Sequence, residues 1–91
     1  MRFTWSRTKA AVNRDKHGVT FGEACTCFND PWHVAMFDPD HSDDEDRELL
    51  IAHSNNGRLL LVSYTLRGTC ARIISARRAT QRESIIYAQG I

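Results

Sequence analysis

The chain has 91 residues, 42% of them hydrophobic and 25% charged, which is enough for one modest core. A net charge of +1 excludes a global field that would attract nucleic acid, and the sequence shows no secretion signal or membrane-length apolar span. Charge is segregated instead, with five Lys or Arg against one acid in residues 2–17 and seven acids against one Arg in residues 38–48. We expect a single domain over residues 1–91, located in the cytoplasm, whose charged segments pair internally or bind different partners.

The N-terminal segment predicts a short strand followed by a helix. Residues 2–5 alternate in the manner of a strand. Ser6 can cap a helix over residues 7–16, because its side chain can accept a hydrogen bond from the first helical turn. Gly18 can end that helix, since glycine readily takes the left-handed conformation.

A second helix is predicted after Thr20, which has Glu23 three residues later in the spacing of a capping box. Residues 21, 24, 25 and 28 fall on one apolar face, and Asn-Asp-Pro at 29–31 ends the helix. The chain has three cysteines, at positions 25, 27 and 70. Their spacing does not fit a zinc site, so we expect core or surface thiols.

The remaining chain predicts four strands and a last helix. The expected strands cover residues 32–37, 47–54, 59–66 and 69–76, a polar loop covers 38–45, and a helix begins at Thr80 with Glu83 in a second capping box.

Two glycine turns, Asn56-Gly57 and Arg67-Gly68, fix a register if each is a two-residue hairpin. One face is then expected to lie under helices. It carries three cross-strand rows: Leu49–Tyr64–Ala71, Ile51–Val62–Ile73 and His53–Leu60–Ser75. The other face places Arg72 opposite Ser63 and diagonal to Glu48. Arg58 and Arg77 are expected to meet near His53. A one-residue difference in a turn would exchange the faces.

Basic residues dominate the chain from residue 67 onward. Arg67, Arg72, Arg77, Arg78 and Arg82 are accompanied there by Glu83 alone. A set of arginines on a rigid sheet suits a polyanion, because guanidinium pairs bidentately with phosphate. The alternative is that these arginines are solvated or pair with the acidic stretch.

His41 lies in the acidic loop, where a neighbouring carboxylate would favour its protonated form as a general acid. Asp38-x-Asp40-x-Ser42 loosely resembles a calcium loop but lacks its glycine, so we expect solvated residues there, Asp43 and Asp44 among them. Lys16 and His17 end the first helix, where they could bind phosphate, transfer protons, or complement the helix dipole.

The order of these residues forms a recognisable pattern over nearly the whole chain. The pattern comprises Phe3, Trp5, Lys9, Asn13, Lys16–Val19, Phe21, Glu23 and Ala24; Asp38, Asp40–Ser42, Glu45 and Arg47; and Gly57, Arg58, Leu60, Tyr64, Thr65, Arg67, Arg72–Arg77, Ala79 and Glu83. It resembles the BrnT family of toxins, from which Ser6 departs because the family usually has Asp there. Both residues are helix caps, so the chemistry is unaffected.

The resemblance implies an α+β fold that is RelE-like: an antiparallel sheet with two N-terminal helices and a C-terminal helix. It implies a ribonuclease toxin that arrests translation and growth, cleaving RNA by attack of the 2′-hydroxyl without metal or another cofactor. The implied partners are RNA and a small ribbon-helix-helix antitoxin, with operator DNA bound only through the antitoxin and no membrane.

Cleavage by the 2′-hydroxyl requires phosphate binding and proton transfer, and these two tasks indicate candidate site residues. Arg72 and Arg77 fit the phosphate-binding role, and His41, Glu45 or His17 could move protons. The sequence leaves open which of these three is the acid and which the base. Candidate RNA-binding residues are Lys16, Arg47, Arg58 and Arg82.

Two other classes of function are considered. A non-catalytic RNA- or protein-binding module, such as an inactive toxin homologue, would need exposed aromatic residues. These are expected to be scarce, since Trp32 and Phe37 fall in a predicted strand and Tyr64 on the core face. A metal-dependent hydrolase would use the carboxylates of residues 38–45.

Overall fold

The computed structural model describes residues 1–41 and 45–90, so the expectation for Asp43 and Asp44 lies outside the described residues. No helix in the described ranges is long and apolar enough to cross a membrane. In chain order the elements are β1 (Arg2–Thr4), α1 (Arg7–His17), α2 (Phe21–Thr26), the 3₁₀ turn η1 (Cys27–Asn29), β2 (Val34–Asp38), the 3₁₀ turn η2 (Pro39–His41), β3 (Arg47–His53), β4 (Leu59–Arg67), β5 (Cys70–Arg78) and α3 (Gln81–Gln89).

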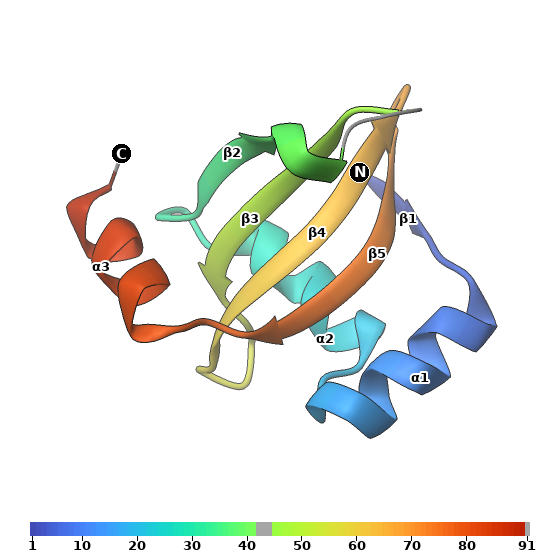
Figure 1. The fold of residues 1–91 in the computed structure, drawn as a ribbon, viewed down its shortest axis with the longest axis horizontal. Coiled ribbons are helices and arrows are strands. Elements are labelled where there is room, and N and C mark those ends of the chain that lie inside the picture. Colours follow the sequence, from blue (N-terminus) through green and yellow to red (C-terminus); the bar gives the residue numbers. More distant parts are fainter. Residues whose placement is uncertain (42–44, 91) are drawn as a thin grey trace.

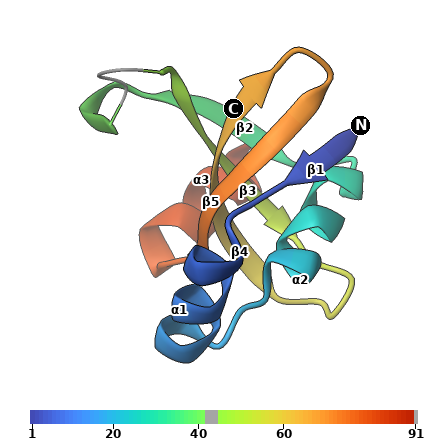
Figure 2. The same cartoon turned by 90° about the vertical axis from the view of Figure 1, so that its right-hand side faces the viewer.

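The strands form one sheet in the order β1-β5-β4-β3-β2. β2 to β5 are antiparallel as predicted, whereas β1 joins β5 in parallel, so the sheet is mixed. α2 covers one face, α1 lies beside β5, and η2 and α3 lie on the other face (Figures 1 and 2). The α+β architecture with two N-terminal helices and one C-terminal helix is therefore confirmed.

Local capping signals set the helix ends. The hydroxyls of Ser6 and Thr20 accept hydrogen bonds from the backbone N–H groups three residues later, at 3.3 and 3.0 Å. Thr80 and Glu83 form the complete capping box of α3. Gly18 ends α1 with φ of 68°, a conformation in which a side chain would be strained. These boundaries confirm the sequence-based ones.

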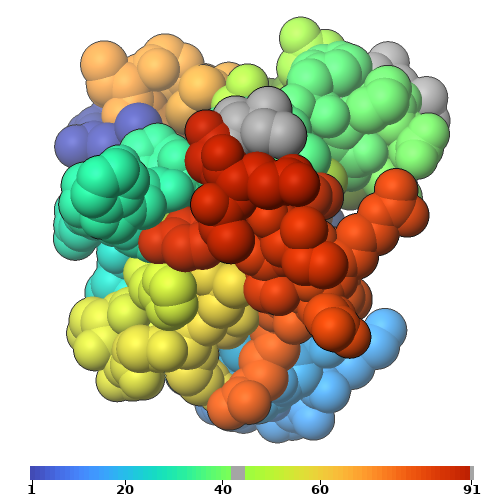
Figure 3. Space-filling model, turned by 90° about the vertical axis from the view of Figure 1, so that its left-hand side faces the viewer, coloured from blue at the N-terminus to red at the C-terminus, as the bar shows by residue number. Residues whose placement is uncertain are grey.

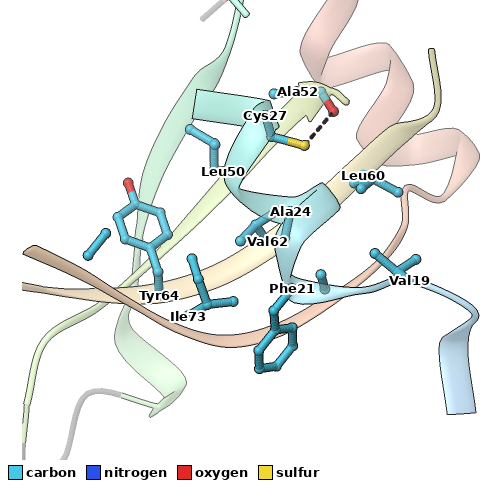
Figure 4. Packing of buried hydrophobic residues seen from close by; sticks show 12 residues of the cluster. Val19, Phe21, Ala24, Cys27, Leu50, Ala52, Leu60, Val62, Tyr64 and Ile73 are labelled. Carbon is cyan, nitrogen blue, oxygen red and sulfur yellow. Dashed lines mark hydrogen bonds between the residues drawn. The ribbon is translucent and has the colours of Figure 1, made fainter. Parts of the chain in front are cut away.

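The core lies between the helices and one face of the sheet (Figure 4). Its members are buried apolar residues of the α1–α2 connection, α2, η1 and strands β3 to β5: Val19, Phe21, Ala24, Cys27, Leu50, Ala52, Leu60, Val62, Tyr64, Ala71, Ile73 and Ala76. All three cysteines are free. Burial raises the pKa of Cys27 to about 12 and that of Cys25 to about 11, which keeps both thiols protonated and unreactive.

The β3–β4 register differs from the prediction by one residue. His53, not Ser54, pairs with Leu59. The reason is a three-residue loop, closed by a 2.9 Å hydrogen bond from Ser54 N to Arg58 O, with Gly57 at φ of 74°. This shift exchanges the faces of β3: Leu50 and Ala52 enter the core, whereas Leu49, Ile51 and His53, which were predicted there, lie on the opposite face, where Ile51 is fully buried.

The β4–β5 turn also differs, because Gly68 and Thr69 form it and Arg67 pairs with Cys70. Arg72 consequently pairs with Thr65 and not with the predicted Ser63. The ladder then shifts by one residue between Ser63 and Tyr64, a β-bulge that places Ala76 in the core in place of the predicted Ser75.

Glu48 lies on the face of the sheet that α2 covers, and not beside Arg72 as predicted. It pairs with Tyr64 across the strands and accepts a 3.0 Å hydrogen bond from the tyrosine hydroxyl. Burial and this hydrogen bond raise the pKa of Tyr64. The predicted diagonal between Arg72 and Glu48 is wrong because the one-residue register shift turns Glu48 to the opposite face.

Asn13 joins α1 to the exposed edge of β5. Its amide nitrogen donates to Val19 O at 2.9 Å and to Ala76 O at 2.8 Å, and its amide oxygen accepts from Ala76 N at 3.0 Å. β1 pairs with β5 only at residues 70–72, so Asn13 supplies the backbone of Ala76 with the partners that a longer neighbouring strand would provide.

Polar contacts hold α3 against the sheet, and none of its described residues is buried. At its start, Arg77 makes two 2.9 Å hydrogen bonds to the carboxylate of Glu83. Near its end, the hydroxyl of Tyr87 donates to Asp30 at 2.7 Å, and burial together with this bond raises the pKa of Tyr87 to about 12. α3 therefore lies on the surface of the molecule (Figure 3).

Candidate active site

A polar groove of about 340 Å³ lies on the face that carries η2, beside the ends of β4 and β5. The residues around it come from α1, η2, the start of β3 and strands β4 and β5: Lys9, Asp40, His41, Glu45, Arg47, Thr65, Arg67, Arg72 and Ile74. Three arginines, a lysine and a histidine thus surround two carboxylates.

Arg72 lies on β5, next to the edge strand of the sheet, between Thr4 of β1 and Thr65 of β4. Its side chain is partly exposed and lines the groove. Among the residues that the structure describes, no hydrogen bond or ion-pair partner engages its guanidinium. A strand arginine without an internal partner, held on a rigid sheet, is suited to bind an external anion.

Glu45 and Arg67 form a bidentate ion pair in the groove. The guanidinium donates hydrogen bonds of 2.7 and 2.8 Å to the two carboxylate oxygens. These hydrogen bonds lower the pKa of Glu45, and the charges of Arg72 and Arg47 act in the same direction. Glu45 is therefore ionised at neutral pH, with positive charge on several sides.

His41 closes the other side of the groove, at the end of η2. Its Nδ1 lies 2.9 Å from Oδ2 of Asp38. The imidazole is 63% exposed, whereas the side chain of Asp38 is only 12% exposed. Oδ1 of Asp38 also accepts a 3.2 Å hydrogen bond from Asp40 N, which ties the carboxylate to the backbone of η2.

Three of the predicted site residues lie away from the groove and from the hollow next to it. Arg58 donates to Glu23 at 3.0 Å and to Gly18 O at 3.1 Å, on the helix side of the sheet. Arg77 binds Glu83 of α3, on the opposite side, so the expected meeting of Arg58 and Arg77 near His53 is wrong. Arg82 is exposed on α3.

Lys16 and His17 lie next to the groove but do not line it. They border a second hollow between α1 and β5, together with Lys9 and Ile74. Lys9 and Ile74 also line the groove, so the two depressions adjoin. Of the predicted residues, the structure thus brings together Arg72, His41, Glu45 and Arg47, with Lys16 and His17 as neighbours.

Sequence reasoning did not assign Lys9 or Thr65 to the site, and it named Arg67 only within the set of arginines and Asp38 only among the carboxylates of the acidic loop. Thr65 is 1% exposed, and of the described buried side chains its hydroxyl is the one without a hydrogen-bond partner. Buried hydroxyls are normally bonded, so this unpaired hydroxyl of a groove-lining residue is an exception within the described residues. Nothing in the local sequence marks Thr65, because its position depends on the β4–β5 register.

Two further expectations concern metal and aromatic residues. In residues 1–41 and 45–90, no group of three or more His, Cys, Asp or Glu side chains is placed to hold a metal ion.

Trp32 is 75% and Phe37 52% exposed, so exposed aromatic side chains are less scarce than predicted. Trp32 precedes β2 and Phe37 faces the helix side opposite Glu48, and neither lines the groove.

The mixed sheet with helices on both faces and a cationic groove is the architecture of a small RelE-like α+β toxin domain. The sequence model of the family described as "Ribonuclease toxin, BrnT, of type II toxin-antitoxin system" matches residues 5–83, and the chain belongs to this family. The chain is similar to the crystal structure of the Brucella abortus ribonuclease toxin BrnT, with a TM-score of 0.65 and 25% identity, covering 89% of this chain and 99% of that one.

No curated protein matches the sequence. Family membership defines the chain as a ribonuclease toxin of a toxin–antitoxin system, with RNA as substrate and an antitoxin as partner.

Proposed function

We propose that the groove of Arg72, His41 and Glu45 is the active site of a metal-independent endoribonuclease that uses the 2′-hydroxyl of its substrate as nucleophile. The observation that carries the proposal is the guanidinium of Arg72, which has no internal partner in the described chain and shares the groove with His41 and Glu45. Phosphate binding, proton donation and proton acceptance are the three tasks of this reaction.

In the proposed step the 2′-oxygen attacks the adjacent phosphorus as its proton passes to Glu45. The bond between phosphorus and the 5′-oxygen breaks, and protonated His41 gives that oxygen its proton. The products are a 2′,3′-cyclic phosphate and a 5′-hydroxyl, with no external reactant consumed. Arg72 stabilises the charge on the phosphoryl oxygens, which is largest in the transition state.

On either side of the cleaved bond, the RNA backbone runs along positively charged side chains. Arg47 and Arg67 supply it within the groove, and Lys9 leads to the hollow bordered by Lys16 and His17. We assign Lys16 and His17 to backbone binding at this second site, because phosphate contacts position a nucleic acid without reading its sequence. Arg58, Arg77 and Arg82 are not part of this path.

The acid limb of the pH profile tests the role of Glu45. Its carboxylate accepts a proton only when ionised, so activity is lost as pH falls through its pKa, which Arg67 lowers below the ordinary 4.5. We expect kcat/KM of Arg67→Ala to fall at a higher pH than that of the wild type, because the hydrogen bonds that lower this pKa are absent.

Measured between pH 4 and 6, the profile of Arg14→Ala is the matched control, since Arg14 is an exposed arginine of α1. An acid limb that stays in place in Arg67→Ala would show that another group is the base.

The antitoxin is proposed to be a small ribbon-helix-helix protein that masks the groove and carries the complex to operator DNA, all in the cytoplasm. The support is the family's description as a type II toxin–antitoxin system. The toxin itself has a net charge of +1, which gives it little attraction for DNA in the absence of that partner.

Induced expression of the wild-type protein is the first test. We expect growth to stop, cellular RNA to be fragmented, and a co-expressed antitoxin to restore growth. Abundant, folded protein with normal growth and intact RNA would contradict the proposed toxicity.

The purified protein separates the alternative functions. We expect cleavage to persist in EDTA and to leave 2′,3′-cyclic phosphate ends, and a 2′-O-methyl group at the cleaved nucleotide to prevent it. Loss of cleavage in EDTA would favour the metal-dependent hydrolase. RNA binding without cleavage in the wild type would favour the non-catalytic module.

A further inference from the structure

We propose that Asp38 is a positioning residue that holds the imidazole of His41 in the orientation of a general acid. This inference rests on the proposed function and adds a residue to its site. It follows from three observations on the His41–Asp38 pair: the atoms in contact, the difference in burial, and the attachment of Asp38 to the backbone.

The contact determines which ring nitrogen faces the substrate. An ionised carboxylate only accepts hydrogen bonds, so Nδ1 of His41 is the donor in the 2.9 Å contact. Nε2 lies on the other edge of the ring and remains for the substrate. Nε2 is therefore the ring atom placed to give a proton to the leaving 5′-oxygen.

Burial supports the same assignment. Asp38 is 12% exposed and lies behind an imidazole that is 63% exposed and lines the groove. Asp38 ends β2, where it pairs with Arg47, and its Oδ1 accepts from Asp40 N. The sheet and the backbone of η2 therefore fix the carboxylate, and the carboxylate fixes the ring.

A purely structural alternative is that Asp38 only stabilises the turn η2. The two accounts differ in whether the effect of Asp38 passes through His41. A double-mutant cycle measures this, because residues that act as one unit give non-additive losses.

The experiment uses a short RNA that the wild type cuts at one mapped bond, made with oxygen or with sulfur at the 5′-bridging position of that bond. A thiolate leaves without being protonated, since a thiol has a pKa of about 8.5. The oxygen substrate therefore needs a general acid and the sulfur substrate does not.

On the oxygen substrate we expect Asp38→Ala to lower kcat by up to about 10²-fold, the usual consequence of misplacing a reacting group. In the His41→Ala background the same change should have no further effect. On the sulfur substrate the deficits of Asp38→Ala and His41→Ala should both nearly vanish, whereas that of Arg72→Ala remains.

Two controls complete the design. Asp15→Ala removes an exposed acid of α1 that lines no part of the groove, and it should leave kcat unchanged on both substrates. Asp38→Asn keeps a hydrogen-bond acceptor for Nδ1 and loses the charge, so it should retain intermediate activity. If Asp38→Ala does not fold, Asp38→Asn tests the positioning role in its place.

The positioning role would be overturned if Asp38→Ala lowered kcat equally in the wild-type and His41→Ala backgrounds. It would also be overturned if the loss of kcat in Asp38→Ala persisted on the sulfur substrate while that of His41→Ala vanished. Either result would leave the proposed function in place. A His41 deficit that persists on sulfur would overturn His41 as the acid, and the inference with it. Absence of cleavage by the wild type would overturn the proposed function itself.

Discussion

Replacement of Arg72 by alanine is expected to lower the rate of RNA cleavage by about 10²–10³-fold, the typical cost of removing one preorganised donor to a transition-state anion. The melting temperature should move by only a few degrees, because no described residue depends on this guanidinium for a hydrogen bond. The measurements are single-turnover cleavage and thermal unfolding of the same preparation, with Arg14→Ala as the matched control.

Arg72→Lys separates charge from geometry. An ammonium keeps the positive charge but cannot reproduce the bidentate contact, so activity should return only in part. The competing account, a cross-strand ion pair with Glu48, has lost its geometric basis, since Glu48 accepts from Tyr64 on the other face. A variant that cleaves RNA normally but melts much earlier would assign Arg72 to the scaffold.

Replacement of Asn13 by alanine should produce the largest loss of stability among the substitutions considered. Three backbone groups, on Val19 and Ala76, lose their hydrogen-bond partner in a region where Asn13 is only 6% exposed. Each unsatisfied buried group costs about 1–3 kcal/mol, so we expect a loss of roughly 3–5 kcal/mol. That is a large fraction of the total stability of a small domain.

Chemical denaturation measures this loss, and Val12→Ala is the neighbouring control. Val12 is 58% exposed on the same helix, so its truncation should change the free energy of unfolding by less than about 0.5 kcal/mol. If Asn13→Ala were as stable as this control, water or a rearranged helix would have to satisfy the edge of β5.

The positions of the helices and strands could be predicted because their signals are local. Ser6, Thr20 and Thr80 satisfy N–H groups only three residues away, and glycine at 18 and 90 ends a helix wherever the chain lies. The family pattern was equally accessible, since it depends on residue order alone. It implies the RelE-like fold, the RNA substrate and the antitoxin without any information on tertiary contacts.

The tertiary structure decided which arginine is available and which acid faces the groove. The loop at residues 55–57 is one residue longer than its Asn-Gly signal suggests, and that residue turns Glu48 into the helix-covered face. Arg58, Arg72 and Arg77 are alike as sequence, but Glu23 engages Arg58 from 35 residues away, and Glu83 engages Arg77 from the next element, α3. Side-chain pairing over such separations follows from packing, which no local pattern encodes.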